Sequence, residues 1–454
     1  MKKYFLLCLT FTYLVSSNLF AQEKEQVQES NLTVVAVGEA TLEKDKMIFQ
    51  DPYFQSSVSS GQKAAANEFV ALLRNDFSFY QKKFFLVEAG ANNTSTRPST
   101  NYDYWGTKGV RFLGTVQVEK GGDGIKLNVT VEDIKQKKLI YTSATSTSIT
   151  NLRKTGHEIA NNIYKQIVGK ESIFKSKIIF VSDRNSKGSK TVKEVYLMDF
   201  DGKNVTQLTT HGGIAISPAL SHDGSKLVYS LISNNNGKRS NQLYLMNLAS
   251  KEAHVISQKE GINSGAIFLP DGNLALTLTF TGNAEIYEMN IEGKTLRKMT
   301  NHFSSDVDPS ITFDGKLMSF LSDRSGRAMI YTMDPNGTEK DVKRISFVGQ
   351  FNATPRFSPD GKEIVFSSWL DRSFDLFRIG SDGTNLIRLT KEFGSNEEPS
   401  YSNDGEFIAF TSERVLSRTR ADKNIYIMDR DGEILGPITQ GFGNCISPRW
   451  YNHQ

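Results

Sequence analysis

"RFSPDGKEIVFSS", residues 356–368, is the stretch that decides the fold, because the chain repeats its pattern. Two short apolar runs flank Pro359, Asp360 and Gly361. This pattern predicts a hairpin, since proline presets one turn position and glycine accepts the positive φ that closes the turn. Similar segments begin at four other places: ALSHDGSKLVYSL at Ala219, IFLPDGNLALTL at Ile267, ITFDGKLMSFLS at Ile311 and SYSNDGEFIAFTS at Ser400. Internal repetition is therefore the main structural signal of this chain.

The repeats number six, and each contains three strand-like runs. The first runs lie at 178–182, 227–231, 274–278, 317–321, 364–368 and 408–412. The second run of each repeat carries an aromatic residue, and these residues recur every 43 to 49 positions, at the upper edge of the spacing of four-stranded propeller blades. They are Tyr196, Tyr244, Tyr287, Tyr331, Phe377 and Tyr426.

A fourth run precedes each repeat except the first, and the segment ISPRW (446–450) follows the sixth repeat instead. This offset predicts that the C-terminus completes the first blade and closes the ring, which removes the open sheet edges. Proline in a strand belongs at an edge, so the prolines of this run predict the innermost strand, which lines the channel. They are Pro218, Pro309, Pro355, Pro399 and Pro448.

The residues before the repeats predict a small mixed α/β domain. Helical spacing of apolar residues occurs in KAAANEFVALLRNDF (63–77) and in HEIANNIYKQIVG (157–169). Thr155 and Glu158 have the spacing of a capping box, although the second helix could also start at Asn151. Strand-like runs lie at 32–37, 84–89, 110–118, 125–133 and 138–143.

The N-terminus predicts an exported protein. Met1–Ala21 contains Lys2 and Lys3, an apolar run and a small-residue cleavage site near Ala21, which is the layout of a secretory signal peptide. No later segment approaches the length of a membrane helix. Cys8 leaves with the signal, so Cys445 alone cannot form an internal disulfide. The formal charge of +4 falls to +2 without Lys2 and Lys3, and no dense basic run with aromatic residues predicts nucleic-acid binding.

These patterns together predict the fold class, an α/β N-terminal domain followed by an all-β six-bladed β-propeller with four-stranded blades. The expected organisation is a signal peptide (1–21), a mobile N-terminal arm (22–31), the α/β domain (32–171), a linker (172–177) and the propeller (178–454). We expect a monomer.

Two segments link this organisation to a known family. NLRKTGHEIANNIYKQIVGKESIFKSKIIFVS (151–182) and YWGTKGVRFLGTVQV (104–118) resemble segments of the TolB family, the periplasmic component of the Tol-Pal system. The resemblance implies a binding protein that contacts the peptidoglycan-associated lipoprotein Pal through its propeller and the inner-membrane protein TolA through its N-terminal segment. It also implies a periplasmic location and a role in outer-membrane integrity and in invagination during cell division.

The partner surface is expected at one mouth of the channel, where six loops connect each outermost strand to the next innermost strand. By analogy with the Pal-facing surface of the family, the expected contact residues are Asn263, Ser264, Asp306, Asn352, Thr354, Asn396 and Asn444. An alternative is that many of these side chains only satisfy the backbone of local turns.

For TolA the candidate is the apolar alternation that begins at Leu32, because an extended segment can add to the sheet edge of another protein. An ordinary core strand is the alternative. The residues concerned are Leu32, Val34, Val35 and Val37.

The mature chain shows few signs of an enzyme, because it contains no HExxH, CxxC or GxSxG motif. We expect no catalytic residue, cofactor or metal. The alternatives are a propeller lyase or hydrolase that uses channel acids such as Asp306, Asp308 and Glu398, or a related repeat protein with a different lipoprotein partner. DFDGKN (199–204) and DRDGE (429–433) hint at calcium loops, but turn chemistry explains them better.

Overall fold

The computed structural model describes residues 43–55, 57–88, 99–121, 124–235, 238–417 and 420–452. Within these ranges the chain forms an α/β domain and a six-bladed propeller, which confirms the predicted fold class. None of the helices in the described ranges is long and apolar enough to cross a membrane.

The α/β domain is a sheet of order β3-β1-β4-β5-β6, with β2 paired to β4. Two long helices pack their apolar faces against it, through Phe69 and Phe77 of the first and Ile159 and Ile163 of the second. The helices are α1 (Ser60–Phe79), α2 (Tyr102–Thr107) and α3 (Leu152–Val168). The strands are β1 (Asp45–Phe49), β2 (Tyr53–Phe54), β3 (Phe84–Leu86), β4 (Val110–Gly121), β5 (Gly124–Asp133) and β6 (Lys138–Thr147).

The helix starts differ in part from the expectation. Ser59 and Gln62 form a capping box at the start of α1. Of the two starts offered for α3, the one at Asn151 is confirmed, because Asn151 is its N-cap and closes a short 3-10 turn (Ile149–Asn151). Thr155 of the alternative capping box lies inside the helix. The expected linker limits remain predictions. Ile173 and Phe174 in that region are buried in the core shared with the helices.

Each blade is an antiparallel four-stranded sheet whose strands follow the chain from the innermost outward, except in the first blade. Blade 2 contains β10 (Ile214–Leu220), β11 (Lys226–Asn235), β12 (Lys238–Asn247) and β13 (Ala253–Ser257), and blade 3 contains β14 (Asn263–Phe268), β15 (Leu274–Leu278), β16 (Glu285–Met289) and β17 (Thr295–Lys298). Blade 4 contains β18 (Asp306–Ile311), β19 (Met318–Ser322), β20 (Met329–Met333) and β21 (Lys343–Arg344). Blade 5 contains β22 (Phe351–Phe357), β23 (Glu363–Leu370), β24 (Ser373–Gly380) and β25 (Ile387–Arg388), and blade 6 contains β26 (Ser395–Tyr401), β27 (Phe407–Ser417), β28 (Arg420–Asp429) and β29 (Ile434–Pro437).

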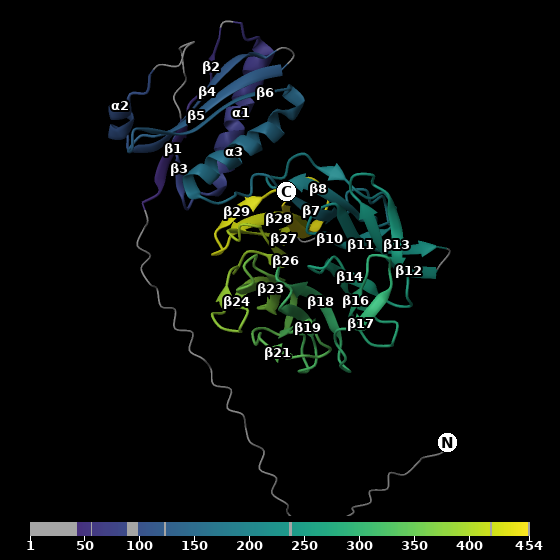
Figure 1. Cartoon of the computed structure of the whole chain (residues 1–454). Coiled ribbons are helices and arrows are strands. Elements are labelled where there is room, and N and C mark those ends of the chain that lie inside the picture. The colour runs from purple at the N-terminus through teal and green to yellow at the C-terminus, as the bar shows by residue number, and fades with distance from the viewer. Residues whose placement is uncertain are drawn as a thin grey trace, which may run out of the picture. The chain divides into compact units, whose positions relative to one another are not determined.

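Blade 1 is completed by the C-terminus, as the offset repeat predicted. Its strand order is β30 (Cys445–Asn452), β7 (Ser176–Ser182), β8 (Glu194–Asp199) and β9 (Thr206–Gln207), and in Figure 1 the C-terminus lies beside β7 and β8. Ile446 pairs with Val181 and Trp450 with Ile178. The Trp450 indole N–H donates to Ser176 Oγ at 2.7 Å. The first and last strands of the propeller therefore belong to one sheet.

The repeated turn is held by its own side chains. In four blades a hydroxyl two residues before the aspartate donates to that carboxylate at 2.6 to 2.7 Å and accepts the backbone N–H three residues beyond it. The glycines have φ between 65° and 87°, which only glycine adopts without strain. These turns, called here the Asp-Gly turns, are Asp223–Gly224, Asp271–Gly272, Asp314–Gly315, Asp360–Gly361 and Asp404–Gly405.

Candidate functional site

The two ends of the channel are defined by the antiparallel sheets. The Asp-Gly turns lie at one end. The loops that lead from each outermost strand to the next innermost strand, and the hairpins between the second and third strands, lie at the other end, which we call the mouth. The mouth loops cover 208–213, 258–262, 299–305, 345–350, 389–394 and 438–444.

A β-bulge interrupts every innermost strand near the mouth. One residue in each strand has a left-handed backbone with φ of 51° to 66°, and the ladder register shifts there. The residue two positions before it is fully buried in all six blades. The bulge residues are Ser217, Gly265, Asp308, Thr354, Glu398 and Ser447, and the buried residues are Ala215, Asn263, Asp306, Asn352, Asn396 and Cys445.

Four of the expected partner-binding residues occupy this buried position and bond to their own blade, to the preceding blade or to a mouth loop. The amide of Asn263 accepts from Ser257 Oγ at 2.6 Å and donates to Lys259 O at 2.8 Å. The amide nitrogen of Asn352 donates to Ser346 Oγ at 2.7 Å. Asn396 Oδ1 accepts from Ser412 Oγ at 2.8 Å, and Asp306 pairs with Arg324 at 2.8 Å. As placed, these side chains shape the mouth from within and are not exposed at its surface.

The other three expected residues are accessible to different degrees. Ser264 and Thr354 are half-buried, and Thr354 shares a hydrogen bond of 3.0 Å with Ser367. Asn444 is exposed, and its amide donates to Asp183 at 2.8 Å. Partner binding by these seven residues stays a prediction. The expected TolA-binding residues Leu32, Val34, Val35 and Val37 lie outside the described residues.

The channel acids of the enzymatic alternative are held by other groups. Asp306 lies against Arg324, and burial raises the pKa of this carboxyl to about 6. Asp308 pairs with Arg356 at 2.8 Å. Glu398 accepts from the backbone N–H and the hydroxyl of Ser447 at 2.6 and 2.7 Å. Each of these three carboxylates is thus already held by an arginine or by Ser447, which does not favour a free acid-base pair.

The acids of the two calcium-like segments also have cationic partners. Lys177 pairs with Asp199 at 2.7 Å, and Arg153 contacts both Asp199 and Asp201. Lys82 pairs with Asp429 and with Asp431, at 2.7 Å each. These lysine and arginine contacts already neutralise the carboxylates that a cation would need.

Large apolar side chains are exposed at the mouth of four consecutive blades, blades 3 to 6, and sequence reasoning missed them. Phe303 is 87% exposed and Phe347 is 72% exposed, and each lies in a mouth loop. Their position in loops, where no core requires them, is the signal that could have identified them. Those on blades 3 to 5 form what we call the mouth patch, which consists of Ile262, Phe280, Phe303, Phe347, Phe351 and Trp369, while Val415 and Leu416 are exposed on blade 6.

Neighbouring side chains hold part of the mouth patch in place. Phe351 and Trp369 lie opposite each other in the ladder of β22 and β23, and both contact Phe374, with ring centroids 6.0 and 5.1 Å apart. The guanidinium of Arg344 lies 4.4 Å from the ring centroid of Phe347. Aromatic residues fixed in this way lose little side-chain freedom when a partner covers them, which suits a protein interface.

Comparison with known proteins identifies the family. A family model described as the TolB beta propeller domain matches residues 164–376. A TolB homologue from Chlorobium luteolum is 30% identical over 365 residues, which cover 80% of this chain and 79% of the relative. The Tol-Pal system protein TolB of Francisella tularensis is 28% identical over 338 residues, covering 71% of this chain and 75% of the relative.

A solved structure supports the same fold. The crystal structure of TolB from Acinetobacter baumannii superposes with a TM-score of 0.73 and 23% identity, covering 90% of this chain and 96% of that chain. On the evidence of the matching propeller model and of the homologue that aligns with four-fifths of its length, the chain belongs to the TolB family.

Proposed function

We propose that this chain is a non-enzymatic scaffold of the Tol-Pal system in the periplasm and acts as a monomer. It binds a Pal-like outer-membrane lipoprotein through the mouth of the propeller and a TolA-like inner-membrane protein through its N-terminal segment. In this role it supports outer-membrane integrity and invagination during cell division. Membership of the TolB family and the names of the relatives support the assignment to this system.

The observation that carries the proposed lipoprotein surface is the mouth patch. Soluble monomers seldom expose several large apolar side chains together unless another protein covers them. Phe303 and Phe347 are the most exposed members, and they precede the innermost strands of neighbouring blades. The half-buried Thr354 and the exposed Asn444 add hydrogen-bonding groups at the same end of the channel.

The direct test is calorimetric titration of residues 22–454 with the soluble domain of the Pal-like lipoprotein from the same organism. We expect Phe303→Ser and Phe347→Ser each to weaken binding by at least about fivefold, because a central aromatic contact contributes about 1–2 kcal/mol or more. Phe313→Ser is the matched control. Phe313 is 75% exposed but follows β18 at the opposite end of the same blade as Phe303.

Unchanged affinity in both mouth variants would reject the mouth as the surface. Absence of binding to the wild-type chain would reject the Pal-like partner and favour a different lipoprotein.

The N-terminal part of the proposal needs a separate measurement. A chain that lacks residues 22–37 should lose binding to the periplasmic domain of the TolA-like protein and keep its affinity for the Pal-like lipoprotein. Retained TolA binding would remove Leu32–Val37 as the contact segment.

A further inference from the structure

The channel ends in a cavity of about 520 Å³ on the side of the Asp-Gly turns, away from the mouth. Its walls come from the innermost strands of all six blades and from several Asp-Gly turns. A cavity of this size falls within the range that holds small organic ligands. Neither the expected partner residues nor the mouth patch contribute to its walls.

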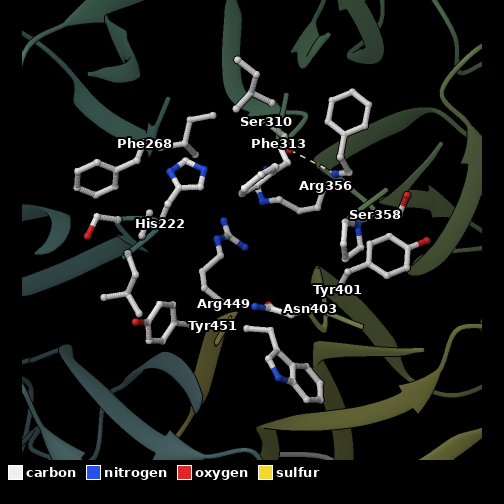
Figure 2. Close-up of a pocket in the computed structure, with 18 residues that line it drawn as sticks. His222, Phe268, Ser310, Phe313, Arg356, Ser358, Tyr401, Asn403, Arg449 and Tyr451 are labelled. Atoms are coloured by element: carbon white, nitrogen blue, oxygen red, sulfur yellow. Dashed lines mark hydrogen bonds between the residues drawn. The ribbon is translucent and has the colours of Figure 1, made fainter. Parts of the chain in front are cut away.

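Two arginines distinguish this cavity from the one that six identical repeats would form. Arg356 and Arg449 occupy the same position in their strands, two residues after the bulge. The other four blades carry uncharged residues there: Ala219, Ile267, Ser310 and Ser400. Figure 2 shows the Arg449 guanidinium in the middle of the ring of lining side chains, with the Arg356 side chain reaching in from another blade. Blades 1 and 5 therefore place positive charge in the channel.

The donors of these two arginines are only partly used. Arg356 pairs with Asp308 at 2.8 Å and donates to Pro355 O at 2.6 Å, but its buried Nε has no partner. Within the described residues Arg449 forms no ion pair, and its side chain donates only to the carbonyl of Pro448, at 3.3 Å.

The nearest acids do not neutralise Arg449. Asp308 and Glu398 attract its charge, but Asp308 is paired with Arg356 and Glu398 is bonded to Ser447. Burial, with repulsion from Arg356, lowers the pKa of Arg449 to about 9. That direction is expected for a cation in a confined space without an anionic partner.

The remaining walls are largely apolar or aromatic. The half-buried Ile311 and the exposed Phe313 line the cavity, and His222 faces it from an Asp-Gly turn. Burial lowers the pKa of His222, so its imidazole is neutral at pH 7. Inorganic anions would leave this apolar surface without contacts, whereas an organic acid would use both features.

We propose that this cavity binds an organic carboxylate, with the carboxylate on Arg449 beside Arg356 and an apolar body against Ile311 and Phe313. The planar fork of a guanidinium matches a carboxylate with two parallel hydrogen bonds. This site is independent of the proposed lipoprotein surface, which lies at the other end of the channel.

The test is calorimetric titration of residues 22–454 with N-acetyl-diphenylalanine and with its C-terminal amide, which has the same body without the charge. We expect the acid to bind at least tenfold more tightly than the amide, since hydrogen bonds between two charged groups are stronger than those to a neutral amide. Arg449→Met should remove this preference and leave the weak affinity for the amide unchanged. Inorganic phosphate, as a separate arm, should not compete with the acid.

Arg327→Met is the matched control, because Arg327 is exposed in the β19–β20 hairpin at the mouth. It should bind the acid like the wild-type chain. The thermal midpoint of Arg449→Met should not fall, because the variant removes a charge that lacks a partner. Should Arg449→Met fail to fold, Arg449→Lys decides the matter, since it keeps the charge but loses the planar fork and should weaken the acid at least threefold.

Equal affinities for acid and amide, unchanged acid binding in Arg449→Met or Arg449→Lys, or no binding of the acid to the wild-type chain would overturn the proposal. Equally strong competition by phosphate would overturn its organic part.

Discussion

Replacement of Trp450 by alanine measures how much the closure of the ring by β30 contributes to the stability of the propeller. The side chain is 8% exposed, stacks on Phe407 with ring centroids 6.4 Å apart, and donates its indole N–H to Ser176 Oγ. Truncation of a buried tryptophan to alanine costs about 3–5 kcal/mol of unfolding free energy. Trp450→Phe keeps most of the packing and should cost about 1–2 kcal/mol, mainly through the lost hydrogen bond.

Urea unfolding followed by far-UV circular dichroism measures these losses without relying on tryptophan fluorescence. Ser176→Ala, combined with Trp450→Phe in a double-mutant cycle, should give a coupling of about 1 kcal/mol across the β30–β7 closure. Trp369→Ala is the control, because Trp369 belongs to the mouth patch and is 36% exposed, so its loss should cost well under half as much. A Trp450→Ala penalty below about 1 kcal/mol would refute the closure as a stabilising contact.

Three further changes test other parts of the fold. Because burial raises the pKa of Asp306 to about 6, the folded chain holds a proton there that the unfolded chain has lost, and stability should fall as the pH rises from about 4 to 6. Asp306→Asn should flatten this slope in thermal midpoints measured across that range, and an unchanged slope would contradict the assignment. Tyr80→Phe should lower the free energy of unfolding in urea by about 2 kcal/mol, because the Tyr80 hydroxyl donates to Asp404 at 2.6 Å and accepts from the Ile173 N–H at 3.0 Å. A loss below about 0.5 kcal/mol would show that these two hydrogen bonds do not stabilise the fold. Gly361→Ala should lower the free energy of unfolding by about 1–2 kcal/mol, because φ is 71° there and the new methyl group would lie 3.1 Å from Thr312 Cγ2. Unchanged stability would show that the turn tolerates a side chain.

The propeller could be predicted from the sequence because each repeat contains short patterns that determine its local structure. Each Asp-Gly turn predicts a hairpin. Runs of consecutive apolar residues predict strands covered on both faces, such as β15, which is buried throughout. The segment ISPRW after the sixth repeat predicted that the C-terminus closes the ring, since a first blade with three strands would leave an open edge. In the α/β domain, β1 and α2 were not predicted, because both are short and lack a strong periodic pattern.

The direction of side chains at the mouth could not be predicted in the same way. A bulge adds one residue to each innermost strand, so the alternation of inward and outward side chains changes there. For this reason Asn352 is buried although it lies only two residues from the half-buried Thr354. In five of the six blades the bulge residue directly precedes the proline of its strand, and that proline is the local signal that could have indicated the bulge.

The mouth patch and the channel arginines were missed for different reasons. Phe303 and Phe347 were not predicted because the prediction for the mouth loops rested on their short polar residues. Their importance becomes clear only when the exposure of the two rings is known. Arg356 and Arg449 could have been found by aligning the innermost strands, since each follows the proline of its repeat. Their charge matters only because the fold brings both side chains into one cavity.

The most direct test of the proposed mouth surface is hydrogen exchange of residues 22–454 with and without a saturating amount of the soluble domain of the Pal-like lipoprotein. Protection is expected in the mouth loops 299–305 and 345–350, which carry Phe303 and Phe347, while the Asp-Gly turns at 314–315 and 360–361 should exchange as in the free chain. Protection confined to the Asp-Gly turns, or no change at either end of the channel, would contradict a mouth that binds this partner.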